Sequence, residues 1–135
     1  LAVATVEVDL SSIGEGEAVK VMWQGKPIFI RHRTAAEIAE ANDVVVKELV
    51  HKEADADRVV EGQEKWLVLI GICTHLGCVP VGTSSGEDKG EYNGWFCPCH
   101  GSHYDTSGRI RKGPAPRNLD LPPYVFTNDT TLLIG

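Results

Sequence analysis

Apolar and polar side chains alternate along residues 2–10, where valine and leucine are separated by glutamate and aspartate. A period of two is typical of a strand with one buried face. Residues 19–23 and 27–31 are rich in Val, Ile and aromatic side chains, and they flank a short turn that contains glycine. These patterns predict a first strand followed by a hairpin.

The next part of the chain changes period. Thr34 and Glu37 fit a capping box, and a helix-favouring run of Ala, Glu and Ile follows, which predicts one short helix. Charges crowd together over residues 43–65 without an apolar period, so we expect mostly loop there, with a turn of helix at 45–49. Residues 66–72 are continuously apolar and predict a buried strand.

The second half of the chain has two hairpin signals. After a Gly, Ser and acidic turn at residues 82–90, Asn93-Gly94 precedes Trp95 and predicts a hairpin that returns the chain to residues 97–102 and brings them beside residues 73–78. Residues 124–127 and 131–134 are strand-like, and an Asn-Asp pair lies between them, which predicts a terminal hairpin.

Composition excludes two classes of protein. The 135 residues carry 13 Lys and Arg against 19 Asp and Glu, a net charge of -6, so a nucleic-acid partner would be repelled. The longest apolar run, residues 66–73, is far shorter than the roughly 20 residues of a membrane-spanning helix. Because the chain begins at Leu1 without a charged and apolar leader, we expect any targeting or anchoring segment to lie upstream.

The four cysteines point to a metal site. All of them lie in two short segments, Cys-Thr-His-Leu-Gly-Cys at residues 73–78 and Cys-Pro-Cys-His-Gly-Ser at residues 97–102, and each segment adds a histidine. Thiolates and imidazoles are the ligands that zinc and iron centres use. The proposal from the residues alone is a site with two Cys and two His ligands, with one further cysteine pair.

Three other interpretations compete at this point. Cys73, His75, Cys97 and His100 would suffice for a tetrahedral structural zinc, although the first Cys-x-His spacing is tight. An all-cysteine two-iron cluster fits the first pair of cysteines but not the second pair, which one residue separates. A thiol redox site is weakly supported, since no Cys-x-x-Cys motif is present.

The two segments resemble the paired cluster-binding loops of Rieske iron-sulfur proteins, at every motif position. The motifs cover residues 66–117, including Gly-Pro-Ala-Pro at 113–116. The resemblance implies one [2Fe-2S] cluster, with Cys73 and Cys97 on one iron and His75 and His100 on the other.

The resemblance also assigns roles to the neighbouring residues. It implies that a disulfide between Cys78 and Cys99 clamps the loops, which indicates the cytochrome bc complex branch and maturation on the oxidising side of a membrane. Ser102 and Tyr104 match hydroxyl donors to the cluster sulfurs, and Leu76 matches an apolar residue at the tip beside the quinol pocket. A basic stretch at residues 109–117 is a solvated face or a docking site for a cytochrome.

The implied fold is all-β and of Rieske type. We expect an antiparallel base built from residues 1–70 and 119–135, a cluster-binding subdomain inserted at residues 71–118, and one short helix. The implied function is that of the iron-sulfur subunit of a quinol-cytochrome c oxidoreductase. His100 would hydrogen-bond ubiquinol in a pocket of cytochrome b and take up a proton with the electron, which then passes to a c-type cytochrome.

Replacing two thiolates by neutral imidazoles makes the cluster less negative, and this raises its potential into a range suited to quinols. We expect the periplasmic side of a bacterial inner membrane, ahead of the mitochondrial intermembrane-space side, with attachment through an anchor. The alternatives are a Rieske subunit of another enzyme, such as an arsenite oxidase, and a structural Cys/His zinc module.

Overall fold

The computed structural model describes residues 4–135, and within them the chain forms nine strands, one α-helix and three short 3₁₀ helices. The strands are β1 (Val6–Asp9), β2 (Ala18–Trp23), β3 (Lys26–His32), β4 (Trp66–Ile70), β5 (Asn93–Cys97), β6 (Ser102–Asp105), β7 (Ile110–Lys112), β8 (Tyr124–Asn128) and β9 (Thr131–Ile134). The helices are α1 (Ala35–Asn42) and the 3₁₀ helices η1 (Leu10–Ser12), η2 (Val46–Glu48) and η3 (Asp55–Asp57). The prediction of a mostly β chain with one short helix is confirmed.

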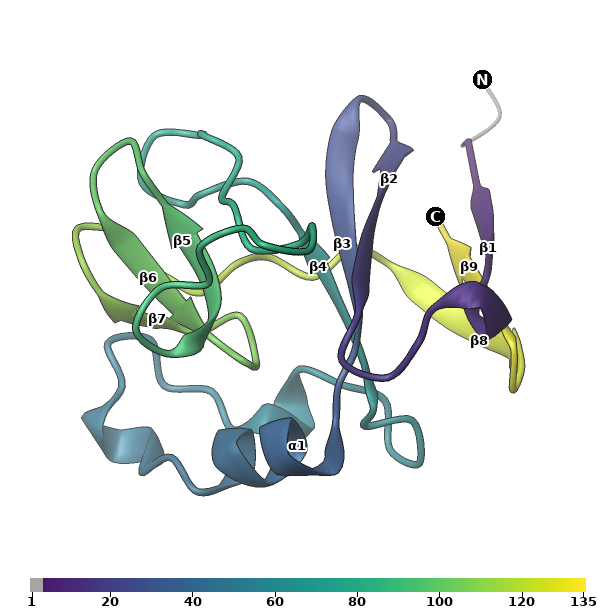
Figure 1. Cartoon of the computed structure of the whole chain (residues 1–135), viewed down its shortest axis with the longest axis horizontal. Helices are drawn as coiled ribbons and strands as arrows, with labels where there is room; N and C mark the ends of the chain where they lie inside the picture. Colours follow the sequence, from purple (N-terminus) through teal and green to yellow (C-terminus); the bar gives the residue numbers. More distant parts are fainter. Residues whose placement is uncertain (1–3) are drawn as a thin grey trace.

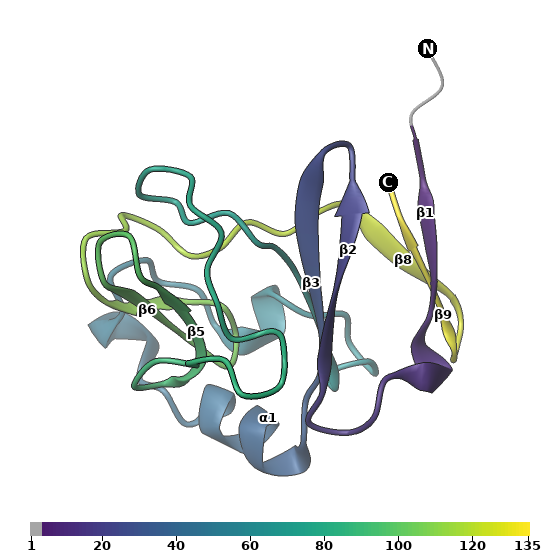
Figure 2. The same cartoon turned by 45° about the horizontal axis from the view of Figure 1, so that its top comes forward.

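The strands form three antiparallel sheets of three strands each, in the orders β1-β9-β8, β2-β3-β4 and β5-β6-β7. Figure 1 shows the sheet of β2, β3 and β4 between the other two, with α1 below it. The same order is seen after the rotation in Figure 2. β1 and β9 come from the two ends of the chain, so pairing between them closes the fold.

Strands β3 and β4 of the central sheet are buried on both faces, whereas β2 has exposed side chains. Side chains of β3 and β4 alternate between two cores: Ile28, Ile30 and Val68 pack toward β1, β8 and β9, whereas Phe29 and Leu69 pack toward β5, β6 and β7. A strand with two buried faces has no polar alternation, which explains the continuous apolar run that begins at residue 66. The second core also contains two of the site cysteines.

Most of the predicted elements are confirmed. The hairpin of β2 and β3 has the expected turn, and α1 has its capping box, in which Thr34 Oγ1 accepts from the Glu37 N–H at 3.1 Å. The expected turn of helix at 45–49 is η2, and the terminal hairpin is β8-β9. Residues 2 and 3 of the predicted first strand lie outside the described residues, and η3 was not predicted.

The interpretation of Asn93-Gly94 as a hairpin turn is wrong. These two residues begin β5, opposite Asp105, at a β-bulge where Asn93 adopts a left-handed φ of 60°. A Cβ on Gly94 would lie 2.1 Å from the Asp105 carbonyl oxygen, so the backbones touch there. The Asn-Gly signal therefore marks a position that needs special backbone angles, but the turn that pairs β5 lies after Cys97.

Within residues 4–135, no helix has the combination of length and apolarity that crossing a membrane requires.

Candidate metal centre

The first cysteine-histidine segment follows β4 directly. The Cys73 N–H donates to the Cys78 carbonyl at 2.7 Å, and the Gly77 N–H donates to the Cys73 carbonyl at 3.0 Å. Gly77 has a φ of 85°, a left-handed conformation that glycine adopts without a steric penalty. These bonds close residues 73–78 into a compact loop at the end of a buried strand.

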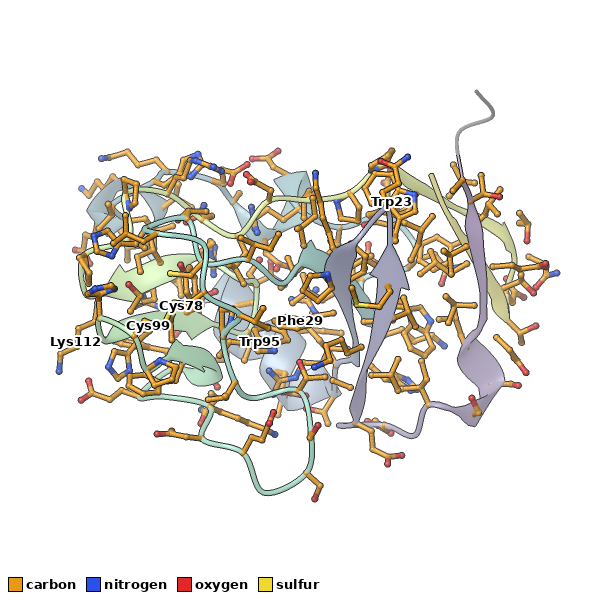
Figure 3. All side chains as sticks on the ribbon, turned by 90° about the horizontal axis from the view of Figure 1, so that it is seen from above. Trp23, Phe29, Cys78, Trp95, Cys99 and Lys112 are labelled. Atoms are coloured by element: carbon orange, nitrogen blue, oxygen red, sulfur yellow. A yellow bond between two sulfur atoms is a disulfide. The ribbon has the colours of Figure 1, made fainter. Side chains whose placement is uncertain are left out.

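The second segment is the turn between β5 and β6. Cys97 and Ser102 face each other across the two strands, and the Gly101 N–H donates to the Cys97 carbonyl at 3.0 Å. A disulfide joins Cys78 of the first loop to Cys99 of the second, as the resemblance implied. Figure 3 shows the two labelled sulfur atoms together at the end of the molecule that lies farthest from Trp23.

The predicted ligand residues lie in two neighbouring pairs, Cys73 with Cys97 and His75 with His100. Cys73 and Cys97 are free, buried thiols. The imidazole rings of His75 and His100 lie edge to face with centroids 4.7 Å apart. His75 Nδ1 is buried and has no hydrogen-bond partner, which is costly for a ring nitrogen unless a metal takes that position. The residues present therefore fit a metal group.

Three sulfur atoms, those of Cys78, Cys97 and Cys99, lie within 4.8 Å of one another. They are not three metal ligands, because the disulfide uses two of them and a disulfide sulfur is not a thiolate. Cys97 is the member of this group that can bind a metal, together with Cys73 on the opposite loop.

Burial controls the ionisation of the site. Burial raises the pKa of the Cys97 thiol, and the neighbouring Cys73 raises it further. A thiolate at this position therefore needs a nearby positive charge, which a bound iron or zinc ion supplies. This dependence couples metal binding to loss of the thiol protons.

Tyr104 lies against the first of these thiols. Its side chain is fully buried, and its hydroxyl oxygen is 3.2 Å from Cys73 Sγ. Burial, with the adjacent Cys73, raises the pKa of Tyr104, so the phenol keeps its proton. Against a thiolate, which has no proton, the phenol must be the donor.

The other two predicted neighbours also lie at the site. Ser102 Oγ accepts a hydrogen bond from the Ala115 N–H at 3.1 Å, which leaves the hydroxyl proton of Ser102 available to a further acceptor. Leu76 is 70% exposed and forms the apolar tip of the first loop. A large apolar side chain that is this exposed beside the site is available for contact with a partner or ligand.

The prediction of a solvated basic face at residues 109–117 is wrong for Arg109, and the docking role of the stretch stays a prediction. Arg109 is fully buried, and its Nε donates to Asp105 Oδ2 at 3.0 Å. Arg111 contacts the same carboxylate at 3.3 Å, Lys112 pairs with a glutamate, and Arg117 forms an ion pair with an aspartate. Each cation of the stretch thus pairs with a carboxylate, and Arg109 and Arg111 share that of Asp105, so most of the positive charge of residues 109–117 is compensated.

Sequence reasoning missed a buried polar layer between residues 51–58 and 105–119. Arg33 pairs with Asp55 at 2.8 Å, and Arg58 pairs with Glu53 at 2.7 Å. The side chains of Arg33, Asp55 and Arg58 are almost fully buried, whereas Glu53 is partly exposed. Arg58 Nε also donates to the Ser107 carbonyl at 2.8 Å, and Ser107 Oγ donates to Asp55 Oδ1 at 2.6 Å. No local signal reveals these bonds, because Ser107 lies about fifty residues further along the chain.

Comparison with known families gives one match that spans the chain. The model of a family described as the Rieske [2Fe-2S] domain matches residues 7–124.

Several curated relatives match all 135 residues, and two of them represent the bacterial and the mitochondrial members. The ubiquinol-cytochrome c reductase iron-sulfur subunit of Rhodospirillum rubrum is 58% identical, and the chain covers 73% of it. The mitochondrial Rieske subunit of the cytochrome b-c1 complex of Candida albicans is 62% identical, and the chain covers 60% of it. The chain therefore spans part of the length of these relatives.

One solved structure, titled a hyperthermophilic respiratory Complex III, contains a chain that superposes with a TM-score of 0.63. That chain is 26% identical, and the superposition covers 93% of the present chain and 71% of the other.

Proposed function

The chain belongs to the Rieske [2Fe-2S] domain family, and from this premise we propose that it is the cluster-carrying head of the iron-sulfur subunit of a ubiquinol-cytochrome c reductase. Two relatives with that role, one bacterial and one mitochondrial, match it over its whole length. The observation that carries the proposal is His75 Nδ1, which is buried and unpartnered beside the His100 ring, in a loop that also supplies a free, buried thiol.

The proposed ligands are Cys73 and Cys97 for one iron and His75 and His100 for the other. The disulfide partners are excluded because their sulfurs are already bonded. When bound, a [2Fe-2S] cluster with this ligand set takes up and gives back one electron at a potential of about -150 to +300 mV. The division into a base of residues 1–70 and 119–135 and an insert of residues 71–118 is part of this proposal. The sheet of β5, β6 and β7 lies entirely within that insert.

Protein groups around the cysteines would tune the potential at which the cluster gains and loses an electron. The Tyr104 O–H donates toward Cys73 Sγ, and a hydrogen bond to sulfur favours the more negative, reduced state. The Ser102 hydroxyl is proposed to act in the same direction on a sulfur of the cluster. The Cys78–Cys99 disulfide holds the two loops at a fixed separation, so the loops would move little when an electron is gained or lost.

His100 is proposed to contact the substrate. It is exposed, whereas Cys73 and Cys97 are buried, so its ring is the polar ligand group that a quinol can reach. With a cluster bound, the ring nitrogen of His100 that does not bind iron would be the group that accepts a proton on reduction, because added negative charge makes an imidazole more basic. Leu76 beside it offers apolar contact to the walls of a quinol pocket.

The proposed partners are ubiquinol, a cytochrome b subunit and a c-type cytochrome. The proposed location is the periplasmic side of a bacterial inner membrane, or the equivalent side of the mitochondrial inner membrane, with attachment through a segment outside the described residues. The net charge of -6 gives no support to a nucleic-acid partner.

Reconstitution tests this function. The full-length subunit is added to cytochrome bc1 membranes that lack their own iron-sulfur subunit, and ubiquinol-dependent reduction of cytochrome c is measured. We expect activity to return with the unaltered chain and to stay absent with His100→Ala. A chain that holds iron and sulfide and still fails to restore turnover would refute the assignment to this complex.

A further inference from the structure

One peptide group links the first ligand loop to a distant histidine. Thr74, between the proposed ligands Cys73 and His75, donates its hydroxyl to the Arg117 carbonyl at 2.6 Å. The N–H of the same peptide group belongs to Asn118, and it donates to His51 Nδ1 at 2.9 Å. Because a peptide group is planar and rigid, fixing its N–H also fixes the direction of its carbonyl.

Hydrogen bonds of the Asn118 side chain anchor this peptide group. Its side chain is 1% exposed, and its Oδ1 accepts from the Ile110 N–H at 3.0 Å. Its Nδ2 donates to Glu53 Oε1 at 2.8 Å and to the His51 carbonyl at 3.2 Å. Every one of these contacts ties residues 117–118 to β7 or to the segment after α1, which Figure 1 shows passing below β7.

We propose, on the basis of the function proposed above, that His51 is a positioning residue for the first ligand loop. It accepts the Asn118 N–H, holds the peptide group in one orientation, and so presents the Arg117 carbonyl to Thr74. The bond to Thr74 in turn restrains the backbone between Cys73 and His75. Hydrogen bonds in such a chain also strengthen one another, since each polarises the next.

The chemistry of the imidazole fits this role. Nδ1 can accept only when it carries no proton, so the neutral ring carries its proton on Nε2. Nε2 lies 3.7 Å from Glu53 Oε1, a carboxylate oxygen that favours a proton on that side. The His51 side chain is 40% exposed, so water competes for Nδ1 and the effect of losing the acceptor is moderate.

The experiment compares variants of the full-length, iron-loaded subunit. His51→Leu removes the acceptor at similar volume. His51→Asn keeps an oxygen near the Nδ1 position and is the rescue variant. Leu49→Ala is the matched control, because Leu49 is buried in the same segment but makes no contact in this chain of hydrogen bonds. For each variant we would measure the rate of iron release to an excess of chelator and the midpoint of thermal unfolding.

We expect His51→Leu to release iron about tenfold faster, which corresponds to the loss of one net hydrogen bond. His51→Asn should restore the unaltered rate. Leu49→Ala should lower the unfolding midpoint with little change in iron release.

A double variant makes the test specific. Once Thr74→Val has removed the hydroxyl, the direction of the Arg117 carbonyl no longer matters, so His51→Leu should add nothing further to the release rate. Additive effects, or equal acceleration by His51→Leu and Leu49→Ala, would overturn the positioning role and leave the iron site intact. An unaltered chain without iron would instead overturn the proposed function itself, so the two failures are distinguishable.

Discussion

Replacing Tyr104 by phenylalanine removes one hydroxyl and leaves the shape of a fully buried ring almost unchanged. The hydroxyl oxygen is 3.2 Å from Cys73 Sγ, and burial raises the pKa of Tyr104, so the protonated phenol would be the donor to a cluster-bound Cys73 thiolate. The hydrogen bond exists in both oxidation states of the cluster, so the midpoint potential depends only on the difference in hydrogen-bond strength between those two states. That difference favours the reduced state, which places more negative charge on sulfur.

A hydrogen bond to a charged group contributes about 1.5–3 kcal/mol, and we assign about 1 kcal/mol of it to the difference between the two oxidation states. For one electron, a tenfold change in equilibrium, about 1.4 kcal/mol, corresponds to about 59 mV. Tyr104→Phe should therefore lower the midpoint potential by about 40 mV.

Redox titration followed by the visible circular dichroism of the cluster measures this shift. Tyr124→Phe is the control, because Tyr124 packs against the other core, and its potential should equal that of the unaltered chain. A Tyr104→Phe potential that is unchanged or higher, in a variant with an unchanged unfolding midpoint, would refute the donor assignment.

Three further predictions concern stability. Cys99→Ser opens a disulfide that spans 21 residues, and it should cost about 3 kcal/mol and speed iron release; a denaturant titration that matches the unaltered oxidised chain would contradict this. Gly94→Ala places a methyl group 2.1 Å from the Asp105 carbonyl and should cost about 2 kcal/mol or more, measured as a lower unfolding midpoint. Burial alone would raise the pKa of Asp55, but hydrogen bonds from Arg33 and Ser107 hold that pKa below its usual value. The stabilisation from ionised Asp55 is therefore complete above the pKa of the unfolded chain and is lost as the pH falls through the lower pKa of the folded chain. Below about pH 4, the free energy of unfolding should therefore fall less steeply with pH in Asp55→Asn than in the unaltered chain.

The sequence predicts what depends on local spacing. The capping box at Thr34 and the hairpin of β2 and β3 are determined by residues a few positions apart, and the structure contains both. The two cysteine-histidine loops are also local motifs, so each can be recognised from adjacent residues, and the tertiary structure then brings the two loops together. The resemblance identified the disulfide because a family pattern already encodes a pairing that spacing alone leaves open.

What the sequence could not predict depends on long-range pairing of polar groups. Arg109 looked like a surface cation because it belongs to a basic stretch with Arg111 and Lys112, yet it is buried and hydrogen-bonded to Asp105, Ala41 and Glu53. Burial of a guanidinium is tolerable only when such partners surround it, and most of these partners are far away in the chain. His51 was hidden for the same reason, since its partner is 67 residues away.

Electron paramagnetic resonance of the dithionite-reduced protein tests whether two thiolates and two imidazoles of this chain hold one two-iron cluster. Iron, zinc and acid-labile sulfide are assayed on the same sample. We expect about two iron atoms and two sulfides per chain, as a two-iron cluster requires, with a signal distinct from that of all-cysteine clusters and nitrogen coupling from two imidazoles. Nitrogen coupling should be lost in part when either His75 or His100 is replaced. An intact protein that contains zinc, with neither sulfide nor signal, would refute the cluster and assign these residues to a structural zinc site.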